Sequence, residues 1–89
     1  MRRKEIAYVA RCDENTCNSI NEKIKAIIKN GGGLVKETEM WESKLGNFND
    51  GFKEDKLFCR ISGIFKAELL NEIDLLLKSE TVVMNHLLG

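Results

Sequence analysis

Two stretches of the chain carry apolar residues at helical spacing, and each predicts a helix with one buried face. In residues 17–30 the spacing is i, i+4, i+7 and i+8, given by Ile20, Ile24, Ile27 and Ile28. In residues 65–78 the same side of a helix would hold Leu69, Leu70, Ile73, Leu76 and Leu77. A helix with one apolar side must bury that side against another element. The remaining residues therefore have to supply a surface that covers two helices.

Alternating segments predict that this surface is a β-sheet. The four predicted strands are residues 4–11, 34–44, 56–64 and 81–88. In the first strand, one face holds Ile6, Tyr8 and Ala10, and we expect that face to be buried. In the third, Leu57, Cys59 and Ile61 lie opposite Phe58, Arg60 and Ser62. The last segment is apolar on both faces, which suits a central strand.

Residues 34–44 give the least regular of the four strand patterns. Simple alternation places Val35 on the same face as Glu37 and Glu39, with Leu34 on the opposite face. A β-bulge would change which side chains share a face, and the pattern allows one near Trp41.

The predicted order is strand, helix, strand, strand, helix, strand, which is the ferredoxin-like α+β arrangement. Two helices would cover one face of a four-stranded antiparallel sheet, and the other face would be open. At 89 residues the chain has the length of a single domain, so we expect residues 1–89 to form one ferredoxin-like domain.

Glycine-rich and turn-rich stretches mark the boundaries. Gly31, Gly32 and Gly33 follow the first predicted helix, so they suit a C-terminal cap rather than a phosphate-binding loop, which precedes a helix. Residues 45–55 are the most turn-rich stretch, and Asn49-Asp50-Gly51 within them is a strong turn signal.

Charge is balanced in the whole chain but not along it. Fourteen basic and fourteen acidic residues give a formal net charge of zero, which excludes a polycation of the histone type. Residues 1–36 hold eight basic and four acidic residues, and residues 37–89 hold six and ten. The N-terminal basic cluster is Arg2, Arg3 and Lys4. Paired guanidinium groups suit phosphate recognition, so a local RNA contact at this cluster is compatible with overall neutrality.

The sequence offers little for catalysis or metal binding. Cys12 and Cys17 lack the CxxC spacing and, with Cys59, are expected to be reduced structural cysteines. His86 stands without a visible triad, so a hydrogen-bonded structural histidine is the favoured interpretation. We therefore predict no enzyme, no metal and no cofactor. No apolar run is long enough for a transmembrane helix, and the N-terminus shows no secretory signal.

Three short motifs resemble one family. The opening Met1-Arg2-Arg3-Lys4-Glu5-Ile6 is similar to the Met-Arg-x-Tyr-Glu start of the bacterial small-subunit ribosomal protein S6 family. The passage from Gly32 to Glu37 matches a family Gly-small-apolar-x-Lys passage, and residues 58–61 also match. The family has the same element order, and the likeness covers nearly the whole chain. Residues 41–48 depart from it, because the family's Gly-x-Arg-x-Leu-Ala-Tyr-x-Ile is replaced there.

The resemblance implies a structural component of the small ribosomal subunit. Family members bind the central domain of the small-subunit ribosomal RNA together with protein S18. On this basis Arg2, Arg3 and the adjacent Lys4 are the candidate RNA contacts. The departures from the family motif favour a mitochondrial ribosome over that of a bacterial cytoplasm.

The open sheet face supplies candidates for protein contact. We expect partner contact at four apolar residues, Ala7, Val9, Phe58 and Trp41. An RNA-recognition motif is rejected because its aromatic consensus is absent from residues 56–64. The alternatives are a ligand-binding or regulatory module of the same fold, often dimeric through its open sheet face, and a small enzyme that uses His86.

Overall fold

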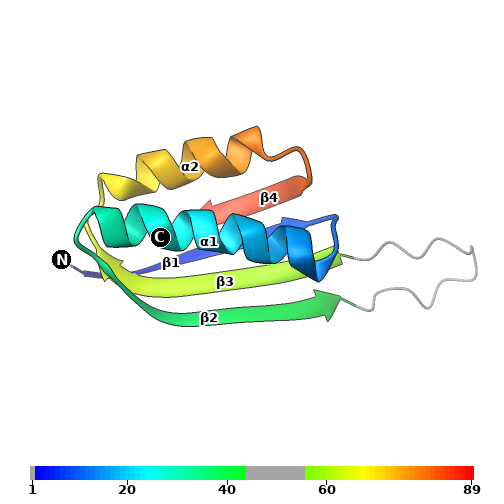
Figure 1. The fold of residues 1–89 in the computed structure, drawn as a ribbon, viewed down its shortest axis with the longest axis horizontal. Helices are drawn as coiled ribbons and strands as arrows, with labels where there is room; N and C mark the ends of the chain where they lie inside the picture. The colour runs from blue at the N-terminus through cyan, green and yellow to red at the C-terminus, as the bar shows by residue number, and fades with distance from the viewer. Residues whose placement is uncertain (1, 44–55) are drawn as a thin grey trace, which may run out of the picture.

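The computed structural model describes residues 2–43 and 56–89. Its six elements follow the predicted order (Figure 1): β1 Arg2–Ala10, α1 Glu14–Asn30, β2 Leu34–Ser43, β3 Lys56–Phe65, α2 Leu69–Ser79 and β4 Val83–Leu88. The turn predicted at residues 49–51 lies outside the described residues.

The four strands form one antiparallel sheet in the order β2-β3-β1-β4, and both helices lie on the same side of it (Figure 1). The ferredoxin-like fold is therefore confirmed. The expectation that the last strand is central was wrong, because among the described strands β4 pairs only with β1 and lies at an edge of the sheet. Its mixed pattern arises at that edge, where Val83 and Leu88 pack against the core while Leu87 is exposed to solvent.

The first helix ends at Asn30 as the sequence predicts, and it begins at Glu14, three residues before the predicted start at Cys17. The Asp13 carboxylate accepts a hydrogen bond from the Thr16 backbone N–H at 2.9 Å, which satisfies one of the unpaired donors at the helix start. At the other end the Gly31 N–H donates to the Ile27 carbonyl at 3.1 Å. Gly32 then takes a positive φ of 80°, a conformation that disfavours any side chain.

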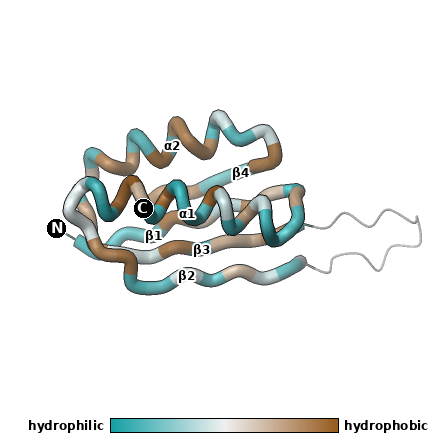
Figure 2. The backbone as a smooth tube through the Cα atoms, viewed as in Figure 1, coloured by the Kyte–Doolittle hydropathy of each residue, from teal (hydrophilic) through white to brown (hydrophobic). Residues whose placement is uncertain are grey.

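The core lies between the helices and the inner face of the sheet. Ile6 and Ile61 on the central strands and Ile24 on α1 are completely buried, as the alternation and the helical spacing predicted. Figure 2 shows that β3 is largely hydrophobic, whereas much of β2 is hydrophilic. The polar group of Tyr8 is also satisfied, because its O–H donates to Asn21 Oδ1 at 2.5 Å within this core.

The bulge in β2 lies near its start and not near Trp41, which corrects the predicted position. Val35 pairs with Gly63 and Glu37 pairs with Ser62, so Lys36 is an extra residue between two successive pairs. The extra residue separates Val35, which packs against the core, from Glu37 on the outer face. Placing Val35 on the same face as the glutamates was wrong for this reason.

The second helix begins later than its apolar spacing suggests. Phe65, predicted as its first residue, is the completely buried end of β3. The stretch 66–68 forms a turn, in which the Leu69 N–H donates to the Lys66 carbonyl at 3.1 Å. The apolar stripe is unaffected, because Ile73 and Leu77 are buried as expected.

Candidate interaction surface on the open sheet face

The outer face of the sheet, opposite the helices, is the part of the described molecule that its own helices leave uncovered (Figure 1). Strand alternation brings side chains from all four strands to it. At one end lies an apolar patch and at the other an ionic network, and the two meet on β3 between Phe58 and Arg60.

The apolar patch consists of Ala7, Val9, Trp41, Phe58 and Leu87. The Trp41 and Phe58 rings stack with their centroids 6.0 Å apart and their planes inclined by 10°. They are direct cross-strand neighbours, and Phe58 in turn pairs with Val9. Trp41 is 47% exposed and Leu87 is 73% exposed. These side chains contribute to the lining of a shallow hollow of about 180 Å³. All four predicted partner-contact residues therefore belong to one continuous surface.

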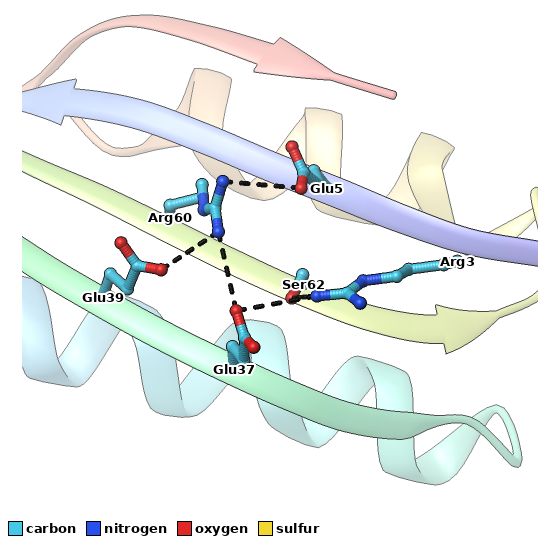
Figure 3. A network of polar contacts seen from close by, with 6 residues as sticks. All are labelled: Arg3, Glu5, Glu37, Glu39, Arg60 and Ser62. Atoms are coloured by element: carbon cyan, nitrogen blue, oxygen red, sulfur yellow. Dashed lines mark hydrogen bonds and ion pairs between the residues drawn. The ribbon is translucent and has the colours of Figure 1, made fainter.

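The ionic network joins two guanidinium groups to three carboxylates (Figure 3). Arg60 lies 3.0 Å from Glu39, 3.5 Å from Glu5 and 3.5 Å from Glu37. Arg3 lies 3.6 Å from Glu37, and its Nη2 donates to Ser62 Oγ at 3.3 Å. The five charged groups leave one negative charge in excess.

Sequence reasoning missed this network. Strand alternation places Glu5 and Arg60 on outer positions, so part of the signal was present. The partners across the strands depend on register, and the bulge at Lys36 sets the register of Glu37 and Glu39 relative to Arg60. A bulge position is not encoded in any simple periodicity.

The structure distributes the predicted RNA contacts over different sides of the sheet. Arg2 is exposed at the start of β1, and Arg3 joins the ionic network on the outer face. Lys4 lies on the helix side, where its Nζ donates to the Phe65 carbonyl at 2.7 Å and lies 5.5 Å from the centre of the Phe65 ring. Strand alternation alone would have separated Arg3 from Lys4.

His86 is a structural link between β4 and α2. Its Nε2 lies 2.6 Å from Asp74 Oδ1, which confirms the favoured interpretation of a hydrogen-bonded histidine. Hydrogen bonds from Lys78 first, and then from His86, lower the pKa of the Asp74 carboxyl. The imidazole is thus engaged with a helix carboxylate on the covered side of the sheet.

The three cysteines are free, and Cys17 and Cys59 are buried. Within residues 2–43 and 56–89, no three side chains of the metal-binding types lie close enough together to hold a metal ion. No helix in this part of the chain has the length and apolarity needed to span a membrane.

Known proteins resemble the chain in both sequence and fold. No family model matches it. The small ribosomal subunit protein bS6 of Clostridium beijerinckii is 24% identical over 90 residues, which cover 99% of this chain and 95% of that protein. The solved 30S ribosomal protein S6 of Thermotoga maritima aligns with a TM-score of 0.76 at 15% identity, covering 99% of this chain and 85% of that one. A putative PII-like signaling protein from Thermus thermophilus aligns at 0.54 with 14% identity, covering 100% and 93%. At these identities the structural likenesses show a common fold.

Proposed function

We propose that this chain, a divergent member of the ribosomal protein S6 family, is a non-catalytic structural component of the small ribosomal subunit. The observation that carries the proposal is the end-to-end alignment with the Clostridium bS6 protein, which covers 99% of one chain and 95% of the other. The structural likeness to the Thermotoga S6 protein agrees with it. The sequence alignment carries more weight, because a ferredoxin-like fold serves many functions.

The open sheet face is the proposed docking site for a protein partner, which the family resemblance identifies as S18. The apolar patch offers exposed aromatic surface at Trp41, and aromatic side chains are enriched at protein interfaces. The neighbouring ionic network has one negative charge in excess, which suits a small basic protein. A partner that places an apolar side chain over the Trp41–Phe58 stack and a basic group near Glu39 would match both halves of the face.

The proposed RNA contact is at the start of β1. Arg2 is exposed there, and Arg3 projects from the same end of the sheet. Lys4 is the third proposed contact, and we expect it to contribute least because its ammonium already binds the Phe65 carbonyl. With an overall charge of zero, the isolated chain should bind RNA weakly and with strong salt dependence.

The two proposed contacts are far enough apart to be used together. Val9 lies seven positions after Arg2 in β1, which corresponds to roughly 24 Å along a strand that rises about 3.4 Å per residue. RNA at the first end would leave the apolar patch free for a protein. The proposal therefore predicts that partner binding increases RNA affinity by adding the partner's own contacts.

Mass spectrometry of gradient-fractionated ribosomes from the source cell tests the ribosomal role. The expected result is that peptides of this chain peak with the isolated small subunit and remain there after a wash in moderate salt. Recovery only in the unassembled fractions at the top of the gradient would contradict the proposal.

RNA contact is tested by binding of the chain and its partner to a transcript of the central ribosomal RNA domain. Replacing Arg2 by Ala should weaken binding. It should also make the negative slope of log affinity against log salt shallower by about 1, because one phosphate contact is lost. Lys29→Ala, on the exposed side of α1, is the matched control and should leave the slope unchanged. An unchanged slope for Arg2→Ala would remove Arg2 from the RNA contact.

The compartment is a separate part of the proposal. The departure of residues 41–48 from the family pattern favours a mitochondrial ribosome, although the named curated relative is bacterial. In a source cell with mitochondria, small subunits purified separately from mitochondria and from cytoplasm should contain the chain only in the mitochondrial preparation. Its presence only in the cytoplasmic preparation would contradict this assignment.

A dimeric regulatory module is the competing proposal, and the likeness to the PII-like protein favours it at the level of fold. In that case the apolar patch would bind a second copy of the chain. Sedimentation equilibrium separates the two proposals, since the ribosomal proposal predicts a monomer for the isolated chain and the module predicts a homodimer that Trp41→Asp dissociates.

A further inference from the structure

Two cysteine sulfurs lie unusually close together where β1 passes into α1. The Sγ atoms of Cys12 and Cys17 are 2.9 Å apart. Cys12 lies in the turn after β1, and Cys17 lies in the first turn of α1. A disulfide bond is about 2.05 Å long, so these sulfurs are less than about 1 Å beyond bonding distance.

Backbone contacts on both sides of the pair hold this arrangement. The Arg11 N–H donates to the Val82 carbonyl at 2.8 Å, which ties the residue before Cys12 to the segment leading into β4. Between the two cysteines, the Asp13 carboxylate caps Thr16, and the Cys17 N–H donates to the Asp13 carbonyl at 3.2 Å. The two thiols are therefore held together by the local fold.

The two cysteines differ in access to solvent. Cys12 is partly exposed, whereas Cys17 is completely buried. A small oxidant in solution would reach Cys12 first, and Cys17 would be the neighbour that reacts next. This division into an accessible thiol and an adjacent resolving thiol is the arrangement found at redox-sensitive sites.

We propose that Cys12 and Cys17 form a modification site at which hydrogen peroxide produces an intramolecular disulfide. The Cys12 thiolate attacks one peroxide oxygen, so an S–O bond forms, the O–O bond breaks, and the departing hydroxide takes up a proton to become water. The Cys17 sulfur then attacks the Cys12 sulfur, the S–S bond forms, and the S–O bond breaks. The second hydroxide takes the Cys17 proton, so two thiols and one hydrogen peroxide give one disulfide and two waters.

The surroundings of Cys17 agree with this order of events. Burial, and then the hydrogen bond with Cys12, raise the pKa of the Cys17 thiol. A thiol with a raised pKa is a poor first nucleophile toward solvent oxidants, because the thiolate is the reactive form. Once Cys12 is a sulfenic acid, the short distance between the two sulfurs compensates for the low nucleophilicity of the Cys17 thiol.

Cys59 is the competing partner. It is buried on β3, opposite Tyr8 of β1. The Cys59 thiol also lies near Cys17 and contributes to the raised pKa of that thiol, but after the hydrogen bond with Cys12. Because the Cys12 and Cys17 sulfurs are only 2.9 Å apart, we expect Cys17 to bond to Cys12 and Cys59 to remain a thiol.

Peptide mapping without reduction tests the site on the full chain. The folded protein is treated with hydrogen peroxide and then unfolded in denaturant so that every remaining thiol, including the buried ones, is alkylated. The chain is then digested with trypsin. Tryptic cleavage after Arg11 and Lys23 leaves both cysteines in one peptide, residues 12–23, while Cys59 falls in residues 57–60. Cleavage after Glu14 then separates Cys12 from Cys17.

The expected result is a peptide 12–23 that is lighter by two hydrogens, carries no alkyl group and stays linked after cleavage at Glu14 until it is reduced. Free thiols should fall from three to one per chain. The site is overturned by a disulfide between peptides 12–23 and 57–60 or by a disulfide between two chains. It is also overturned if Cys12 gains oxygen while Cys17 remains a thiol and is therefore alkylated.

Two variants test the order of reaction. Cys17→Ala should accumulate a Cys12 sulfenic acid that dimedone traps, because the resolving thiol is missing. Cys59→Ala, the matched control, should form the peptide 12–23 disulfide as the natural chain does. Loss of that disulfide in a folded Cys59→Ala protein would overturn the assignment, and thermal unfolding verifies that each variant is folded.

Discussion

The two faces of the sheet carry side chains from the same strands, yet they are held in different ways. On the covered face Ile6, Ile61 and Phe65 are completely buried beneath two helices. On the outer face Trp41 is half-exposed, and Arg60 lies among carboxylates that water also reaches. The covered face therefore supplies most of the folding free energy, and the outer face can be changed at much smaller cost. A surface of the second kind is where binding residues can be placed.

The largest expected effect is on the covered face. Ile61→Ala removes a completely buried side chain from the central strand, so the free energy of unfolding should fall by about 2–5 kcal/mol in urea denaturation. Leu75→Ala, at an exposed position of α2, is the control and should stay within about 0.5 kcal/mol of the natural chain. Similar losses in the two variants would contradict the contrast between buried and exposed positions.

The next effect is at the bulge that separates the two faces. A Cβ on Gly63 would lie 2.5 Å from the Leu34 carbonyl oxygen, which is too close for any side chain. Gly63→Ala should therefore cost about 1–3 kcal/mol of unfolding free energy as β2 moves away. Gly89→Ala, where a Cβ meets nothing within 4 Å, is the matched substitution and should be neutral. A neutral Gly63→Ala would mean that β2 and β3 are not in the described register.

A smaller effect is expected in the ionic network. Arg60→Ala removes all three Arg60 ion pairs, but exposed pairs contribute only up to about 1 kcal/mol. The difference between Arg60→Ala and the natural chain should shrink further in high salt, because salt screens exposed charges. A loss that is large and independent of salt would show that the outer face is also required for folding.

The smallest effect is a pH dependence on the covered side of β4. Because the pKa of the Asp74 carboxyl is lowered in the folded state, its contribution to stability is present above the ordinary value of about 3.9 and is lost as pH falls through the lower folded value. The stability difference between the natural chain and Asp74→Asn should therefore be measurable at neutral pH and shrink in acid. Glu72→Gln on the same helix is the control. A difference that grows in acid would contradict the assignment.

Sequence reasoning predicted the covered face well, because burial imposes a period on the sequence. The isoleucine spacing predicted which side of α1 is buried. The alternation of Ile6, Tyr8 and Ala10 predicted which face of β1 is buried. The start of α2 was misplaced because Phe65 fits the apolar spacing of a helix and equally ends a buried strand. Whether such a residue belongs to the strand or to the helix is decided by its tertiary contacts, which the sequence pattern does not contain.

The outer face could be predicted in part. Alternation gave Ala7, Val9 and Phe58 correctly as outer-face residues, and Trp41 stacks on Phe58 as their neighbour. The facing of Glu37 relative to Val35 depended on the bulge at Lys36, and the Arg60 network depended on cross-strand register. The Cys12–Cys17 contact depended on how a turn brings two thiols together. None of these three features has a periodic signature.

The measurement that tests the central claim most directly compares two tagged variants in the same cells. Trp41→Ala alters the apolar patch on the outer face, and Leu75→Ala alters an exposed apolar residue on the helix side. If the outer face docks the chain onto a ribosomal partner, Trp41→Ala should be depleted at least severalfold from the small-subunit peak, whereas Leu75→Ala should be incorporated like the natural chain. Equal incorporation of both folded variants would contradict the account.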